Sequence, residues 1–176
     1  KGVDQKLNPG FLGALLSAYE HQAEGLNLLR HLASHEILHS DSVDKVFQGN
    51  DSLFGSLFSE YARGYSQKFL GLVLDPTFNL VLALNLELEP LRLPVGASTS
   101  KACAKVAKVL EEMVDRVRTV GPLTFPVNLR ILFNHVEEEV MARFGCLKTR
   151  ATKVSQRLLF GRLIVSSFLR MTRTIL

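Results

Sequence analysis

The sequence predicts an all-α protein, and three observations support this prediction. Apolar residues recur at steps of three and four over most of the chain, which is the period of an amphipathic helix. The breaks between these stretches carry helix signals, with Asp, Asn or Ser before a first turn and Gly or Pro after a last one. Alternating apolar and polar residues are confined to residues 86–93, where Pro90 interrupts them, so an extended edge segment is expected there and not a central strand.

The first half of the chain is expected to hold four helices. Asn8 caps the first, and Pro9 takes its first helical position. Residues 48–51 break the helical pattern because Gly and Asn tolerate left-handed backbone, and Asp51 or Ser52 caps the helix that follows. The expected helices begin at Pro9, cover Ala23–Leu38, run from Ser52 to about Phe69 and from Asp75-Pro76 to about Asn85, with a short helical turn ending near Phe47.

The second half is expected to hold three more helices, which makes about seven in a single helical domain spanning residues 1–176. Residues 94–100 form a flexible, linker-like stretch, and Ser100 caps a helix that Gly121 and Pro122 end. The next helix runs from Pro126 to Phe144 and stops at Gly145. The last begins near Thr152 and runs to the C-terminus, with Val154, Leu158, Val165, Phe168 and Leu169 expected to face inward.

Composition narrows the functional classes. The hydrophobic fraction of 47% excludes a disordered chain, and the two cysteines are too few for a disulfide framework, which favours a cytoplasmic protein. From Arg143 to Leu176 the chain has 8 Lys and Arg and no Asp or Glu. This basic end carries no recognised nucleic-acid motif, so a solvated helix face is favoured over nucleic-acid binding. Contact with an acidic membrane surface or an acidic partner is the alternative that the charge leaves open. No uninterrupted apolar segment of about 18 residues occurs, so contact with a membrane would be peripheral.

One motif suggests metal chemistry. His35, Glu36 and His39 match the HExxH pattern, in which two histidines one helical turn apart share a zinc ion and the glutamate activates a water. Glu60 is the candidate third ligand. The competing interpretation, a helix end with surface histidines, is favoured because no strand pattern precedes the motif. A zinc hydrolase therefore stays as the less favoured alternative, and no metal or other cofactor is expected.

Five stretches, in a consistent order, resemble the Ras GTPase-activating domain. Residues 28–37 (LLRHLASHEI) are similar to the helix before that family's finger loop, and residues 46–53 (VFQGNDSL) are similar to the loop itself. Residues 74–78 (LDPTF), followed by residues 86–93 (LELEPLRL), resemble a helix start and a short segment of the family. Phe168, Leu169 and Arg170 match its Phe-Leu-Arg signature on a late helix. The resemblance implies an all-helical fold, in agreement with the periodicity.

The resemblance also implies roles for particular residues. The family's loop inserts an arginine beside the nucleotide of a Ras-family GTPase, and this arginine accelerates hydrolysis by about 10³–10⁵. The matching position here is Gln48, whose neutral amide lacks a guanidinium's charge. Asp51 lengthens the loop and adds a negative charge. The loop residues implied to contact the GTPase are Phe47, Gln48, Gly49, Asn50, Ser52 and Leu53, and Phe168, Leu169 and Arg170 are implied to brace the loop.

We therefore expect a domain that interacts with a Ras-family small GTPase and activates it weakly or not at all, a regulator more than an enzyme. One alternative keeps only the fold and acts as a protein- or membrane-interaction scaffold. Another supplies the missing arginine from elsewhere, with Arg63 or Arg173 as candidates. The family's later helices complete its binding groove, so the chain is expected to be the earlier part of a longer domain.

Overall fold

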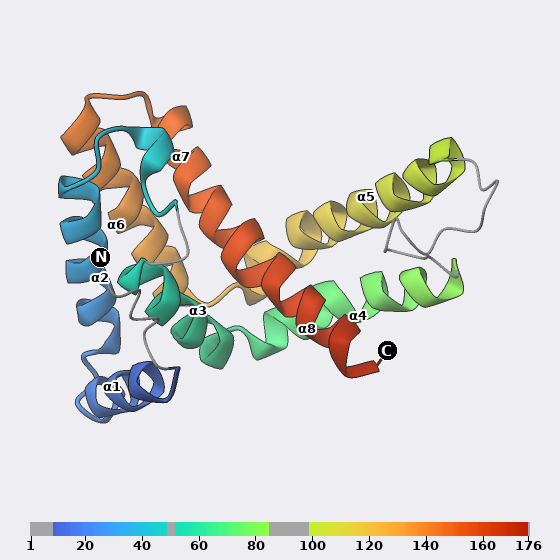
Figure 1. Ribbon diagram of the computed structural model, residues 1–176, viewed down its shortest axis with the longest axis horizontal. Helices are drawn as coiled ribbons and strands as arrows, with labels where there is room; N and C mark the ends of the chain where they lie inside the picture. The colour runs from blue at the N-terminus through green and yellow to red at the C-terminus, as the bar shows by residue number, and fades with distance from the viewer. Residues whose placement is uncertain (1–8, 49–51, 85–98, 176) are drawn as a thin grey trace, which may run out of the picture. The chain divides into compact units, whose positions relative to one another are not determined.

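The computed structural model describes residues 9–48, 52–84 and 99–175, and these residues are helical apart from short connections (Figure 1). No strand occurs among them, so the predicted all-α class is confirmed. The chain forms two compact units. Unit 1 combines residues 1–66 with residues 126–176, and unit 2 covers residues 67–125. The expected extended segment at residues 86–93 and most of the expected linker at 94–100 lie outside the described residues.

Unit 1 begins with three helices and one short turn. Pro9 is the first residue of α1, as predicted, and Ser52 is the residue that caps α3. Ala23 does not begin a helix as expected, because its backbone is left-handed (φ 57°) and forms the turn that leads into α2. The bounds are α1 Pro9–His21, α2 Gly25–Leu38, the 3₁₀ turn η1 Val43–Lys45 and α3 Leu53–Tyr65.

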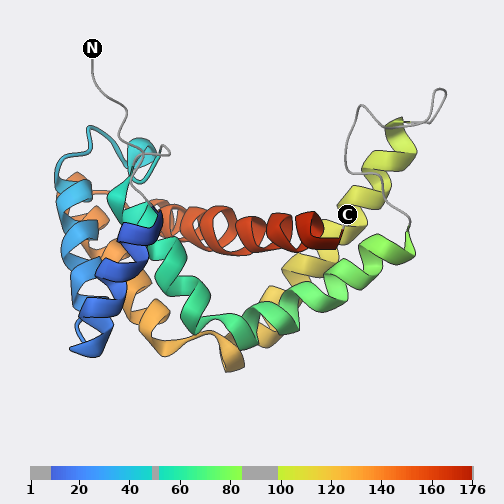
Figure 2. The same cartoon turned by 60° about the horizontal axis from the view of Figure 1, so that its bottom comes forward.

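The rest of unit 1 lies after residue 125. Helix α6 spans Val127–Phe144 and ends at Gly145, whose left-handed backbone (φ 58°) stops the helix as predicted. The final run begins at Lys148, earlier than expected, and passes through α7, the π-helix η3 and α8. Figures 1 and 2 show this run as one long, unbroken helix. Counted as one, it brings the helices of the described residues to the expected seven, with bounds α7 Lys148–Arg157, η3 Leu158–Val165 and α8 Ser166–Ile175.

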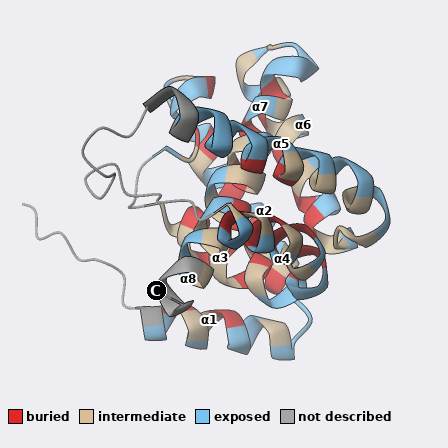
Figure 3. Ribbon diagram, turned by 90° about the vertical axis from the view of Figure 1, so that its right-hand side faces the viewer, coloured by how far each residue is buried: buried red, intermediate tan, exposed pale blue. Residues whose placement is uncertain are grey.

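The core of unit 1 is built from the apolar faces of α2, α3, α6 and the last helical run. Figure 3 marks the buried residues of the helices in red. One side chain per turn is buried on α2, in the order Leu29, Ala33, Ile37. Aromatic rings fill the space between α3 and α6, with Phe58 and Phe133 at 5.9 Å between ring centroids. The other fully buried side chains of these helices are Phe54, Leu57, Tyr61, Ala62, Leu129, Leu132, Val136, Val140, Ala151, Val154, Leu158, Leu163 and Ile164.

Unit 2 is a pair of antiparallel helices, α4 Gln67–Ala83 and α5 Thr99–Thr124. Phe69 at the start of α4 meets Phe125 just after α5 in an edge-to-face contact of 5.1 Å. At the other end, Lys105 donates to the Leu84 carbonyl oxygen. The pairing of first with last residues establishes the antiparallel arrangement.

Two predicted helix boundaries in unit 2 are wrong, both because a proline lies inside a helix. Asp75-Pro76 was expected to start a helix, and Pro122 to end one, yet α4 and α5 run through them. A proline removes one backbone donor and costs about 3 kcal/mol in a helix interior. In α4 this cost is offset by burial on both sides of Pro76, including Val73 and the fully buried Thr77, whose hydroxyl donates to the Val73 carbonyl.

The inward face of the last helical run also differs from the prediction. Val154 and Leu158 are buried as expected, whereas Val165 and Leu169 are exposed, and Leu163 and Ile164 are buried in their place. The π-helix explains the difference, because its wider turn of i→i+5 hydrogen bonds shifts the following residues around the helix axis. A constant helical period cannot predict such a shift.

Candidate functional site

The loop that contains Gln48 is held at its α3 end by Glu36 of α2. Ser52 caps α3, because its Oγ accepts a hydrogen bond from the Gly55 amide at 2.8 Å. The same hydroxyl donates to the Glu36 carboxylate, with an Oε2 distance of 2.7 Å. The Phe54 amide donates to Glu36 Oε1 at 2.9 Å. One carboxylate from another helix therefore fixes the first turn of α3.

The other end of the loop is held by Arg157 of the last helical run. Its guanidinium donates to the carbonyl oxygens of Asp44 at 2.7 Å and Val43 at 2.9 Å, both in η1. Val46 follows and is buried. Phe47 has a left-handed backbone (φ 56°), and its ring packs against Phe54 at 4.4 Å. A left-handed phenylalanine is strained, and the ring contact and the anchored carbonyls of the preceding turn keep it in place.

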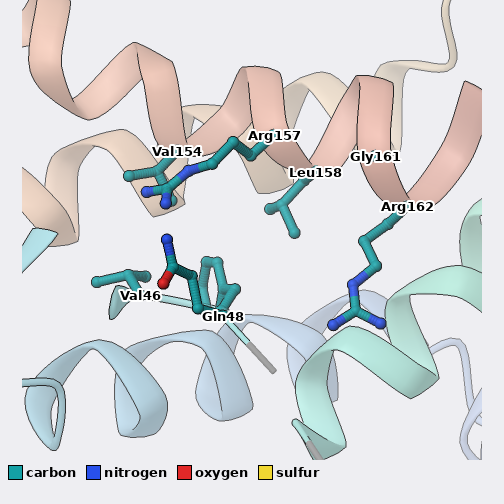
Figure 4. A pocket seen from close by; sticks show the side chains of 8 residues that line it. Val46, Gln48, Val154, Arg157, Leu158, Gly161 and Arg162 are labelled. Atoms are coloured by element: carbon teal, nitrogen blue, oxygen red, sulfur yellow. The ribbon is translucent and has the colours of Figure 1, made fainter. Parts of the chain in front are cut away.

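Gln48 follows this strained residue and lies at a cavity of about 310 Å³. The backbone N–H of Gln48 donates to the Lys45 carbonyl oxygen at 3.0 Å, which fixes the backbone at this residue. The side chain of Gln48 is exposed. Figure 4 shows the Gln48 amide pointing from the loop towards α7 and η3, which form the facing wall. The residues around the cavity are Val46, Phe47, Gln48, Val154, Arg157, Leu158, Gly161 and Arg162.

The facing wall carries two arginines, and the loop carries none. Arg157 bonds the η1 carbonyls, as described above. Arg162 extends towards α3, where a Cβ on Gly55 would lie 3.3 Å from its Cζ (Figure 4). A bulkier residue at Gly55 would therefore displace the Arg162 side chain. The positive charge of this wall suits an anionic group, whereas the Gln48 amide contributes hydrogen bonds without charge.

The sequence-predicted site residues are only partly brought together. Phe47, Gln48, Ser52 and Leu53 form the two described ends of the loop, while Gly49, Asn50 and Asp51 lie outside the described residues. Phe168, Leu169 and Arg170 lie on α8, and they are not among the residues around the cavity. Their bracing role stays a prediction.

Sequence reasoning missed Arg157, the residue that bonds the backbone before the loop. A partial signal was present, since Arg157 directly precedes the apolar Leu158 in the acid-free end of the chain. Nothing in the sequence indicated that its partners would be carbonyl oxygens more than one hundred residues earlier.

The HExxH residues take structural positions. Glu36 is engaged by Ser52 and Phe54, so its carboxylate is turned to the loop. The His35 and His39 rings are exposed and lie 4.3 Å apart, and His39 Nδ1 bonds the His35 carbonyl oxygen at 2.8 Å. Glu60, the candidate third ligand, pairs with Arg63 at 2.7 Å. Within the described part of the chain, no three His, Cys, Asp or Glu side chains are grouped to hold a metal ion.

Comparison with models of known protein families gives no match, and a search of curated proteins finds no similar sequence. The resemblance to the Ras GTPase-activating domain therefore rests on the motifs of the chain itself. Among the described helices, none has both the length and the apolar composition needed to cross a bilayer.

Proposed function

We propose that this chain binds a Ras-family small GTPase through the Phe47–Gln48 loop and the facing wall of α7 and η3, and that it accelerates GTP hydrolysis weakly or not at all. The observation that carries the proposal is the position of Gln48. It is exposed at the rim of a cavity, on a loop whose two ends are anchored by Arg157 and Glu36. An anchored loop that presents the polar side chain of Gln48 suits insertion beside a bound nucleotide.

The weak activation follows from the chemistry of that side chain. Charge accumulates on the phosphoryl oxygens during hydrolysis, and a finger arginine neutralises it. The Gln48 amide has no charge and only two N–H donors, so it contributes little to that neutralisation. Arg63, suggested as a substitute, lies on α3 and pairs with Glu60 at 2.7 Å, which makes it a weak candidate for the role. The side chain of Arg173 lies outside the described residues.

The zinc hydrolase alternative gains no support. A metallohydrolase of that type needs its motif glutamate facing a metal-bound water, and Glu36 instead caps α3. The fold-only scaffold remains the competing interpretation, and it differs from the proposal in a measurable way, because a scaffold need not distinguish the nucleotide state of a GTPase.

A binding experiment tests the proposal. The chain is titrated against a panel of Ras-family GTPases loaded with GDP or with a non-hydrolysable GTP analogue, and binding is followed by interferometry. At least one member is expected to bind with a preference for the GTP-analogue state. In that pair, Gln48→Glu is expected to weaken binding about tenfold or more, because it places a negative charge near the nucleotide phosphates.

The matched control is Gln22→Glu, which adds the same charge at an exposed position after α1. It is expected to leave the affinity within about twofold. Absence of any nucleotide-dependent binding across the panel would contradict the proposal and favour the scaffold. Equal losses for the two variants would show that net charge, and not the loop, governs binding.

A further inference from the structure

One end of unit 1 gathers several chain segments that are distant in sequence. Helices α2 and α6 run parallel, since His135 bonds the Arg30 carbonyl and Arg143 bonds the Leu38 carbonyl with the same sequence separation of 105. Their C-terminal ends therefore lie together. Helix α7 starts at this end after the Gly145 turn, and η1 contacts α7 beside it. In Figure 1 the α6–α7 connection is the orange segment at the upper edge of unit 1.

Two leucines at this end are exposed to solvent. Leu38, the last residue of α2, is 60% exposed, and Leu147, the residue that precedes α7, is 79% exposed. Leu38 ends a helix and Leu147 precedes one, and both side chains are exposed, so neither is buried against a neighbouring helix. We call the surface formed by Leu38, Arg143, Leu147, Lys148, Arg150 and Lys153 the corner surface.

The charge of the corner surface is positive. Residues 143–153 contain four cations and no acidic residue. Arg150 is paired with Asp44 at 3.1 Å, and the other acidic group nearby, Asp41, is paired with Lys45. Arg143 lies over the Phe144 ring and bonds the Leu38 carbonyl, so it has no acidic partner in the described structure. Lys148 and Lys153 are exposed.

The acidic residues of α6 are set back from the corner surface. Glu137, Glu138 and Glu139 lie on α6, at least four residues before Arg143. At a rise of about 1.5 Å per residue, they are set back from the end of α6 by about 6 Å or more. The cations and exposed leucines therefore project beyond these three glutamates, while the two aspartates at this end, Asp41 and Asp44, are paired with Lys45 and Arg150.

We propose that the corner surface docks on membranes that contain acidic lipids, with Leu147 and Leu38 entering the headgroup region and the cations contacting lipid phosphates and carboxylates. The combination of unpaired cations with leucines at a projecting turn fits a flat anionic surface. A peptide partner would need an apolar groove, and the 310 Å³ cavity of unit 1 is lined by different residues. Binding of this kind is peripheral, and it strengthens with acidic lipid and weakens with salt. The proposal does not depend on GTPase binding.

Co-sedimentation with vesicles tests the proposal. The chain is mixed with phosphatidylcholine vesicles that contain either about one-third phosphatidylserine or none, at low and high salt. Binding is expected only with phosphatidylserine, and it is expected to fall steeply at high salt. Leu147→Ser is expected to lower the partition coefficient about fivefold. The double variant Lys148→Gln/Lys153→Gln is expected to lower it by about twentyfold to thirtyfold, or about fivefold per charge.

Unit 2 provides matched controls. Leu123→Ser changes a leucine that is 86% exposed, and Lys68→Gln/Lys108→Gln removes two exposed lysines, all outside the corner surface. These controls are expected to bind like the unaltered chain. Circular dichroism of every variant checks that its helix content is retained. Failure of the unaltered chain to bind acidic vesicles at low salt would overturn the proposal, and so would equal losses for corner and control variants. Binding to an acidic polypeptide but not to vesicles would assign the corner surface to a protein partner instead.

Discussion

At the scale of single residues, the positions of Glu36 and Gln48 depend on neighbours that lie far away in sequence. Glu36 belongs to a motif that suggests metal hydrolysis, and its partners Ser52 and Phe54 make it a structural cap. The motif could be found from the sequence, but its partners could not, because the contact spans 16 to 18 residues and a loop. Gln48 was found through the resemblance, whereas its anchoring by Arg157 depends on a contact between opposite ends of the chain.

The structural role of Glu36 predicts a loss of stability. In Glu36→Ala the Ser52 hydroxyl and the Phe54 amide lose their acceptor, which is expected to cost about 2 kcal/mol of unfolding free energy. The measurement is urea unfolding followed by circular dichroism. His35→Ala is the matched control, since its ring is exposed, and its change is expected to stay within about 0.5 kcal/mol. An unfolding free energy of Glu36→Ala equal to that of the unaltered chain would contradict the role of Glu36 at the start of α3.

Tyr65 predicts a pH dependence at the alkaline end. Its hydroxyl donates to the Glu20 carboxylate, and this hydrogen bond, with burial and the Glu20 charge, raises the pKa of Tyr65 to about 12. The folded-state pKa of Tyr65 exceeds the unfolded value of about 10. The stability that the protonated Tyr65 hydroxyl contributes is therefore complete below about pH 10 and is lost as the pH rises towards 12. Tyr65→Phe is expected to flatten the fall in urea midpoint over this range.

The flattening in Tyr65→Phe is expected to be partial. Burial also raises the pKa of Tyr61, so part of the alkaline loss is expected to persist in the variant. If the urea midpoint of Tyr65→Phe falls with pH as steeply as that of the unaltered chain, the Tyr65–Glu20 hydrogen bond is not the cause of the alkaline loss. The absence of tryptophan from the chain allows tyrosinate absorbance to follow the ionisation directly.

At the scale of helices, prediction succeeded where local signals agree with packing. Pro9, Ser52 and Gly145 mark helix ends in both the sequence and the structure. The local signals at Pro76 and Pro122 failed, because α4 and α5 continue through these prolines. At Pro76, burial of Val73 and Thr77 offsets the cost of a proline inside a helix. Propensity is a local quantity, and these two helices are stabilised by contacts that the local sequence does not specify.

The π-helix η3 gives a prediction at this scale. Ile164 is fully buried and Val165 is 43% exposed, the reverse of what the unshifted α-helical pattern indicates for Val165. Ile164→Ala is therefore expected to lower the unfolding free energy by about 3 kcal/mol, and Val165→Ala by less than about 1 kcal/mol. Urea unfolding of the two variants makes the comparison. A larger loss for Val165→Ala would contradict the shifted register.

At the scale of the whole molecule, the sequence was sufficient for the all-α class and the number of helices, since both follow from periodicity. The division into two compact units was not expected, because it depends on which helices contact one another. The charge distribution, too, was only partly predictable from the sequence. The acid-free end was evident from the sequence, and the structure divides its arginines between a loop anchor, Arg157, and an exposed corner that includes Arg143.

An anchored loop presents Gln48 at the position that, by the resemblance, corresponds to the finger arginine of the Ras GTPase-activating family. The most direct measurement is single-turnover GTP hydrolysis by the GTPase partner, with the unaltered chain, Gln48→Arg and the control Gln22→Arg. The unaltered chain and the control are expected to accelerate hydrolysis little, and Gln48→Arg is expected to add at least about tenfold, part of the 10³–10⁵ that a finger arginine supplies. Strong acceleration by the unaltered chain, or no gain from a Gln48→Arg variant that still binds the GTPase, would contradict the account.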